Sequence, residues 1–399
     1  MAPRSNTHLS SRLCVLAAFA ASIGAWSAAA LAGPTVTPIN LGPVFYFDSG
    51  RASALSGDGT TVVGGGNIAT SPYSYHGFRW TLGGGAEDLG GFAGEYQSGA
   101  VGVNFDGTAV IGWSYYLDGT QRGVRWTAGG GMEDLGALPG TDYTESSGIT
   151  NDGLTVIGTC VSISPPSNQG AFRWTPGGGI TPLNVAPLAG GSVAYAAAIS
   201  GDGAVIAGQS DTGTSTAHAF RWDAVGGTQD LGVLPGDDFS YALAMSADGA
   251  TVVGASGDFT GSDVINNRPF RWTSEGGLQD LGLLPGAYRA VSSFVSADGS
   301  IVWGRSIHIE EPRGRQFFWT ESHGLMELNA FLNLLGVDSG EWTIGDFTDM
   351  SDDGTVLLGW GTDSEGNYTD LLITGVPAPG SGTALLLGAL CIARRGRRG

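Results

Sequence analysis

The sequence contains no lysine, and all 18 of its basic residues are arginine. Six of these arginines lie before residue 33 or after residue 393, whereas all 37 acidic residues lie between the two ends. Without its ends the chain keeps 12 arginines against 37 acidic residues, a net charge of −25. Such a surface repels nucleic acid and anionic lipid, which argues against both as partners. The lack of lysine also excludes Schiff-base chemistry.

Cysteine is scarce as well, with three residues at Cys14, Cys160 and Cys391. The first and last lie in apolar end segments, so a processed chain would keep Cys160 alone. A single thiol excludes an internal disulfide and a thiolate metal site. Charged residues make up only 14% of the chain, while 69 glycines and 11 tryptophans are present without a Gly-X-Y period. This composition excludes a disordered chain and a collagen, and it favours short β-strands joined by tight turns.

The N-terminus has the pattern of a secretory signal peptide. Arg4 and Arg12 precede an apolar stretch from Cys14 to Ala32, which ends in the small-x-small sequence Ala30-Leu31-Ala32. We therefore expect residues 1–32 to be a signal peptide that signal peptidase removes between Ala32 and Gly33. The alternative is an uncleaved membrane helix.

The C-terminus, residues 376–399, has three parts. Pro377 and Pro379 are followed by an apolar run over 383–393, and then by a cluster that contains Arg394 and Arg395. The run is about half of the ~20 residues that a membrane-spanning helix needs. This tail resembles a PEP-CTERM sorting signal, with Ala378 where that signal has Glu. The resemblance implies recognition by an exosortase-like enzyme and only transient contact with the membrane. The alternative is a generic hydrophobic tail.

Between the ends the chain repeats itself with a period of about 49 residues. The Asp of an Asp-Gly turn recurs at positions 58, 106, 152, 202, 248, 298 and 353. A tryptophan recurs at Trp80, Trp126, Trp174, Trp222, Trp272 and Trp319. Each unit has room for four short strands, and this period with several strands per unit is typical of a β-propeller.

The two ends of the repeat region complement each other. The unit of Asp353 has a third strand at 370–374 but no fourth, and the segment 38–42 resembles a fourth strand with no strands before it. We therefore predict an all-β fold, a seven-bladed β-propeller over residues 33–375 built from four-stranded repeats of about 48 residues. Its last blade is closed by the N-terminal strand, so that the sheet leaves no free edge.

One unit carries the sequence Ala219-Phe220-Arg221-Trp222 directly after His218. This segment resembles the HAF-type extracellular repeat of bacterial surface proteins. The resemblance covers nearly the whole processed chain and implies an exported repeat protein, secreted or at the cell surface. Unit two has Val124 for Phe, and unit six has Phe318 for Arg.

The repeated residues are interpreted as structural. The tryptophans are expected in the core between blades, with sugar stacking as the alternative. Arg221 and Asp230 lie on neighbouring strands of one hairpin, and we expect them, like their counterparts in three other units, to form an ion pair. The alternative is a cleft that binds acidic polymers.

No catalytic or metal-binding constellation stands out in the sequence. Neither Gly-x-Ser-x-Gly nor His-Glu-x-x-His occurs, so no catalytic residue and no cofactor is assigned. Calcium is possible at acidic loops, around Asp346, Asp349, Asp352 and Asp353 or at Asp363 with Glu365, because oxygen ligands suit that ion. Loops that precede the first strands carry candidate binding residues, namely Asp142, Tyr143, Asp237, Asp238 and Tyr241.

These observations favour a non-catalytic interaction or structural module of the cell surface or extracellular matrix. Its partners would be extracellular polysaccharides or surface proteins. The alternative is a carbohydrate-active propeller enzyme with carboxylates at the central channel, because glycosidases use such pairs.

Overall fold

The computed structural model describes residues 33–45, 50–69, 74–92, 95–162, 169–183, 185–213, 216–259 and 264–378. The chain divides into two units, Met1–Gly33 and Pro34–Gly399, and all that follows concerns the second. Most of the predicted signal peptide and sorting tail, including Ala32, Pro379, Arg394 and Arg395, lies outside the described residues. Gly33 and Pro377 are the processing residues that fall inside them. No helix in these ranges has the length and apolar character to cross a membrane.

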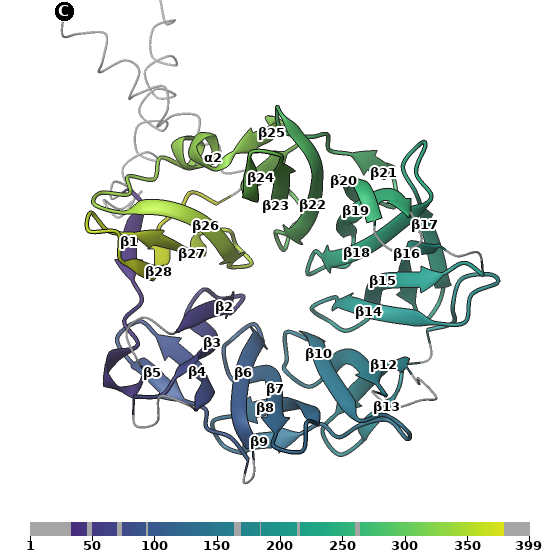
Figure 1. The fold of residues 1–399 in the computed structure, drawn as a ribbon, viewed down its shortest axis with the longest axis horizontal. Coiled ribbons are helices and arrows are strands. Elements are labelled where there is room, and N and C mark those ends of the chain that lie inside the picture. The colour runs from purple at the N-terminus through teal and green to yellow at the C-terminus, as the bar shows by residue number, and fades with distance from the viewer. Residues whose placement is uncertain are drawn as a thin grey trace, which may run out of the picture. The chain divides into compact units, whose positions relative to one another are not determined.

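The described strands form four-stranded units arranged in a ring (Figure 1). The first strand of each unit lies nearest the centre of the ring: β2 (Arg51–Leu55), β6 (Glu95–Val103), β10 (Tyr143–Ile149), β14 (Ala194–Ile199), β18 (Phe239–Met245), β22 (Ala287–Val295) and β26 (Thr343–Met350). The second strands are β3 (Thr61–Asn67), β7 (Ala109–Tyr116), β11 (Val156–Val161), β15 (Val205–Asp211), β19 (Thr251–Phe259), β23 (Ile301–His308) and β27 (Val356–Thr362).

The third strands are β4 (Tyr75–Thr81), β8 (Gln121–Thr127), β12 (Gln169–Thr175), β16 (Ala217–Asp223), β20 (Val264–Thr273), β24 (Glu311–Thr320) and β28 (Tyr368–Thr374). The fourth strands are β5 (Gly85–Asp88), β9 (Gly131–Asp134), β13 (Gly179–Pro182), β17 (Gly227–Gly232), β21 (Gly277–Asp280), β25 (Gly324–Glu327) and, from the start of the chain, β1 (Thr35–Pro38). Four units are separate sheets, and single parallel bridges join the other three into one twelve-stranded sheet. Neighbouring strands within a unit are antiparallel, as the predicted propeller requires.

The N-terminal strand closes the last blade. β1 pairs antiparallel with β28, from Thr35 opposite Thr374 to Pro38 opposite Leu371. The predicted position of this strand, 38–42, was wrong by a few residues. Ile39 donates its N–H to the Asp370 carbonyl, just as Leu89 donates to Gly77, so Pro38-Ile39 takes the place of Asp-Leu. Residues Gly42–Val44 form a short 3-10 helix, η2, with a proline in its first turn.

The Asp-Gly turns shape the hairpins between first and second strands. In the first unit, Ser56 donates its hydroxyl to the Asp58 carboxylate, and Gly59 adopts a φ of 73° that favours glycine. Backbone bonds also join turns of successive units, for example from Gly201 N–H to the Ala247 carbonyl. The bond from Asp352 N–H to the Gly57 carbonyl joins the last unit to the first, and it completes the ring.

Buried aromatic residues hold neighbouring blades together. Each of the six repeated tryptophans belongs to or packs against an apolar cluster that combines residues of two consecutive units. Trp126, for instance, packs with Ala54 and Val63 of the preceding blade. These residues therefore belong to the core between blades, where truncating a large side chain is costly.

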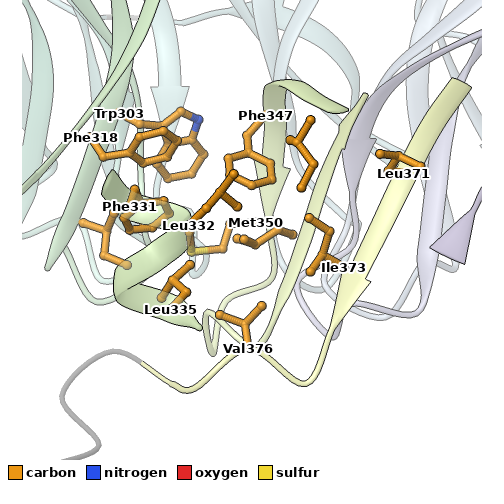
Figure 2. Packing of buried hydrophobic residues seen from close by; sticks show 13 residues of the cluster. Trp303, Phe318, Phe331, Leu332, Leu335, Phe347, Met350, Leu371, Ile373 and Val376 are labelled. Carbon is orange, nitrogen blue, oxygen red and sulfur yellow. The ribbon is translucent and has the colours of Figure 1, made fainter. Parts of the chain in front are cut away.

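The largest cluster contains a helix that the sequence analysis did not predict. α2 (Leu328–Leu335) stands between the sixth and seventh units and places Phe331, Leu332 and Leu335 against the core (Figure 2). Phe318, which replaces the repeated arginine, stacks on Phe331 with ring centres 4.0 Å apart. Apolar residues at 328, 331, 332 and 335 follow helical spacing, and Gly336 ends the helix with a φ of 69°.

Candidate functional site at the rim of the ring

In each unit, a glycine of the second strand allows the first strand to approach closely at one point, and this point defines an equivalent residue in all seven first strands. In every unit a glycine pairs with the residue that follows this position, as Gly254 pairs with Ala242 after Tyr241. A Cβ on that glycine would overlap the carbonyl oxygen of the preceding residue, Tyr241 in this unit. The missing side chain thus lets the first strand lie close at this point. We call the seven positions the rim: Arg51, Gly99, Glu145, Tyr195, Tyr241, Val291 and Asp346.

The rim differs chemically from unit to unit, although the positions next to it do not. The residues that follow the rim positions are small in six units, with Ala or Ser, and all seven are buried. At the rim itself two carboxylates, one guanidinium and two phenols occur. Since the scaffold repeats and these side chains do not, the rim is the candidate functional site of the ring.

A cleft of about 470 Å³ opens between the two rim phenols, Tyr195 and Tyr241. It is lined by Tyr195 and Gln209 of the fourth unit, by Phe239, Tyr241 and Asn267 of the fifth, and by Arg289 of the sixth, together with Ala197, Ala242 and Leu243. Burial raises the pKa of Tyr195 and of Tyr241, while the Arg289 charge acts in the opposite direction on Tyr241. Both phenols therefore keep their protons at neutral pH and serve as hydrogen-bond donors.

Asn267 is a buried polar residue of the cleft. It is 7% exposed, and its Nδ2 donates to the Tyr241 hydroxyl at 3.3 Å. Its Oδ1 is buried without a hydrogen-bond partner in the described part of the chain. The preceding Asn266 has a φ of 55°, and the ladder between β19 and β20 is irregular beside it. This local irregularity holds a costly unpaired acceptor at the cleft.

Two carboxyl groups occupy rim positions outside the cleft. Asp346 on β26 is 5% exposed and forms an ion pair with Arg305 of the preceding unit. Burial raises the pKa of Asp346, and the Arg305 charge opposes this shift only in part. Glu145 on β10 is exposed. Acid–base catalysis combines a carboxyl group that donates a proton, for which burial and a raised pKa are favourable, with a carboxylate that accepts a proton.

Two further carboxylates join the last blade to the first. Asp349 accepts the N–H of Leu55 at 2.8 Å, and Asp370 accepts the N–H of Ala52 at 2.8 Å. Burial raises the pKa of each to about 6. Because both bind backbone groups of β2, their role is to hold the closure of the ring.

Of the predicted binding residues, Tyr241 alone lines the cleft. Asp237 is paired with Arg268 at 2.8 Å, and Asp238 accepts the Phe259 N–H. The Asp142 carbonyl accepts from Arg122, and the Tyr143 hydroxyl donates to Gln121 at 2.6 Å. The other polar residues of the cleft were missed. The sequence did contain a signal for the rim residues. Each of them stands five positions before the first residue of its Asp-Gly turn, as Tyr241 stands before Ser246.

The predicted ion pair between Arg221 and Asp230 was wrong. The strand register places Asp230 opposite Phe220, on the face that it shares with His218, and His218 Nδ1 lies 3.0 Å from Asp230. Arg221 lies on the other face, where it pairs with Asp223 at 2.7 Å. The glycine-rich turn of this hairpin shifts the strand register by one residue relative to the predicted register. As a result, Asp230 and Arg221 lie on opposite faces of the sheet.

The described residues include no cluster of three or more His, Cys, Asp or Glu side chains placed to hold a metal ion. In the acidic segments expected to bind calcium, Asp363 accepts backbone N–H groups of Glu365 and Asn367, and Asp353 accepts that of Thr355. Calcium binding stays a prediction.

A scan against protein-family models found no match, and neither did a search of curated proteins. Solved structures are similar in fold. They include an oligogalacturonate lyase from Vibrio parahaemolyticus, with a TM-score of 0.56 and 11% identity over 85% of this chain and 93% of that one. An oligogalacturonate lyase in complex with manganese matches with a TM-score of 0.53 and 13% identity over 87% and 93%. A prolyl endopeptidase matches with a TM-score of 0.52 and 11% identity over 84% and 51%.

At these identities the likeness shows the fold, a β-propeller, and the predicted fold class is confirmed. The interpretation as a non-catalytic module is corrected by the same finding. Two of these structures, which match along most of both chains, are oligogalacturonate lyases, and this favours the carbohydrate-active alternative over the main interpretation.

Proposed function

We propose that this chain is a carbohydrate-active enzyme that cleaves a glycosidic bond at the rim of its propeller. The observation that carries the proposal is the rim itself. Its seven equivalent positions bring two carboxyl groups, two phenols and a guanidinium to one level of an otherwise repetitive ring. Phenol rings, amides and a guanidinium beside a cleft are groups that bind sugar hydroxyls and ring faces. The likeness in fold to the oligogalacturonate lyases is consistent with this reading.

The two rim carboxyl groups have complementary roles in the proposed reaction. Asp346, whose pKa burial raises, protonates the oxygen of the departing sugar. Glu145 takes the proton of the attacking water, and the hydroxide adds to the sugar carbon as the glycosidic bond breaks. Arg305 pairs with the carboxylate that Asp346 becomes once it has given up this proton.

Export is part of the proposal, and its support is the sequence alone. The stretch that ends in Ala30-Leu31-Ala32 and the PEP-CTERM-like tail both favour an enzyme that acts outside the membrane. Polysaccharides of the cell surface or matrix are then the substrates within reach.

A panel of neutral and acidic polysaccharides, incubated with the folded chain, tests the proposal through the appearance of new reducing ends. We expect release from at least one polymer, and a loss of at least about 100-fold in rate for Glu145→Gln and for Asp346→Asn. Glu133→Gln, on β9 away from the rim, is the matched control and keeps the wild-type rate. Because Asp346→Asn leaves Arg305 without its partner, its folding is checked by circular dichroism. The proposal is overturned if no polymer is cleaved, or if Glu145→Gln, folded, cleaves at the wild-type rate.

A further inference from the structure

The cleft beside Tyr241 holds a cation that forms no ion pair with the described carboxylates. Arg289 on β22 lines the cleft, and its guanidinium carbon lies 5.5 Å from the centre of the Tyr288 ring. The ion pairs of the described residues do not include it, although other arginines of this acidic chain, such as Arg268 and Arg315, are paired. An unpaired guanidinium in a cleft is poised to receive a carboxylate from outside.

A second, independent feature points to the same cleft. The buried Oδ1 of Asn267 has no donor among the residues that the structure describes, while Nδ2 of the same amide donates to the Tyr241 hydroxyl. A buried unpaired acceptor costs free energy of folding, and a ligand hydroxyl would satisfy it. Asn266, with a φ of 55°, and the irregular ladder beside it set the position of this amide.

Taken together, these groups describe a ligand with one anionic group next to a hydroxyl. We infer that the cleft is a subsite for a sugar residue that bears a carboxylate, which Arg289 pairs while Asn267 Oδ1 accepts a hydroxyl proton. Tyr195 and Tyr241 add phenol groups on either side, and Phe239 offers a ring face against which a sugar can pack. The rest of the chain is strongly acidic, so a densely charged polyanion is repelled and isolated carboxylates are preferred.

This inference rests on the proposed function for the polymer, and it is tested by binding alone. Isothermal titration uses a tetrasaccharide with one hexuronate residue among neutral hexoses, its methyl ester and the neutral hexose tetrasaccharide, with acetate as a free anion. The variants are Arg289→Gln and Asn267→Leu, and Arg173→Gln, an exposed arginine outside the cleft, is the control.

We expect the hexuronate to bind at least about tenfold more tightly than its ester, and Arg289→Gln to remove that difference without weakening the ester. Asn267→Leu weakens acid and ester alike, whereas Arg173→Gln changes neither. Equal binding of acid and ester, binding of acetate as tight as that of the hexuronate, or an unchanged preference in Arg289→Gln overturns the inference. Preferential binding of the acid without cleavage of any polymer of the panel refutes the proposed function and leaves the subsite standing. Cleavage of a polymer without preferential binding of the acid refutes the subsite and leaves the proposed function standing.

Discussion

Arg221 donates its Nε–H to the carbonyl oxygen of Gly249, which belongs to the Asp-Gly turn of the next blade, at 3.2 Å. The same bond joins residues 28 positions apart in three other units, Arg79 to Gly107, Arg125 to Gly153 and Arg271 to Gly299. The repeated arginine therefore fastens each of these blades to its successor. Within the described residues, this arginine does not engage the Asp that the sequence predicted as its partner. In two units the arginine also pairs within its hairpin with the residue that precedes that Asp, Arg79 with Glu87 at 3.9 Å and Arg125 with Glu133 at 3.8 Å.

Replacing Arg125 by methionine tests whether the repeated arginine stabilises the contact between neighbouring blades. Arg125 also lies over the Trp174 ring of the next blade, with 5.5 Å to the ring centre. We expect a loss of about 1–2 kcal/mol in the free energy of unfolding, because a hydrogen bond from a charged group and a cation–π contact are both removed, while the long ion pair of Arg125 with the exposed Glu133 adds little. Urea denaturation measures this loss. Arg173→Met is the control, because Arg173 contacts Thr155 within its own blade. Equal effects of the two variants would contradict the fastening role.

The stacking of Phe318 on Phe331 predicts that helix α2 is integral to the core. Phe331 is 1% exposed, and Phe331→Ala should lower the free energy of unfolding by about 3–5 kcal/mol, because the cavity cannot fill. Chemical denaturation compares it with Asn333→Ala, an exposed position on the same helix that should change stability by less than about 0.5 kcal/mol. A loss below about 1 kcal/mol for Phe331→Ala would show that α2 is dispensable for packing.

The closure of the ring should be more stable in mild acid. Burial raises the pKa of Asp370 to about 6, above its unfolded value, so the fold binds this proton more tightly than the unfolded chain does. Stability contributed by this group is therefore lost as pH rises through about 6. We expect Asp370→Asn, whose amide oxygen can still accept the Ala52 N–H, to show a smaller fall in Tm between pH 5 and pH 8 than the wild type. Parallel curves would contradict the burial of this carboxylate.

Processing of both ends is tested by the intact mass of the protein recovered from the surface and medium of its source cell. The sequence predicts a chain that begins at Gly33 and ends near residue 380, after signal peptidase and an exosortase-like enzyme have acted. A mass that retains residues 383–399 would refute sorting at the C-terminus.

The repeated parts of this fold were predictable, because Asp-Gly turns and tryptophans mark each blade in the sequence. Features that depend on a single unit were not. Helix α2 replaces one loop, and its apolar spacing was hidden by the expectation of a repeat. The partner of Asp230 depended on a one-residue register that a glycine-rich turn leaves open. Asn267 reaches the cleft through an irregular ladder that no sequence pattern marks.

The most direct test of the account is the rate at which new reducing ends appear when the folded chain meets the panel of neutral and acidic polysaccharides. The double variant Glu145→Gln/Asp346→Asn is compared with the wild type at equal concentrations of folded protein. We predict steady release by the wild type and none above background by the double variant, because both proton transfers are lost. Release at the same rate by both proteins, or by neither, would contradict cleavage at the rim.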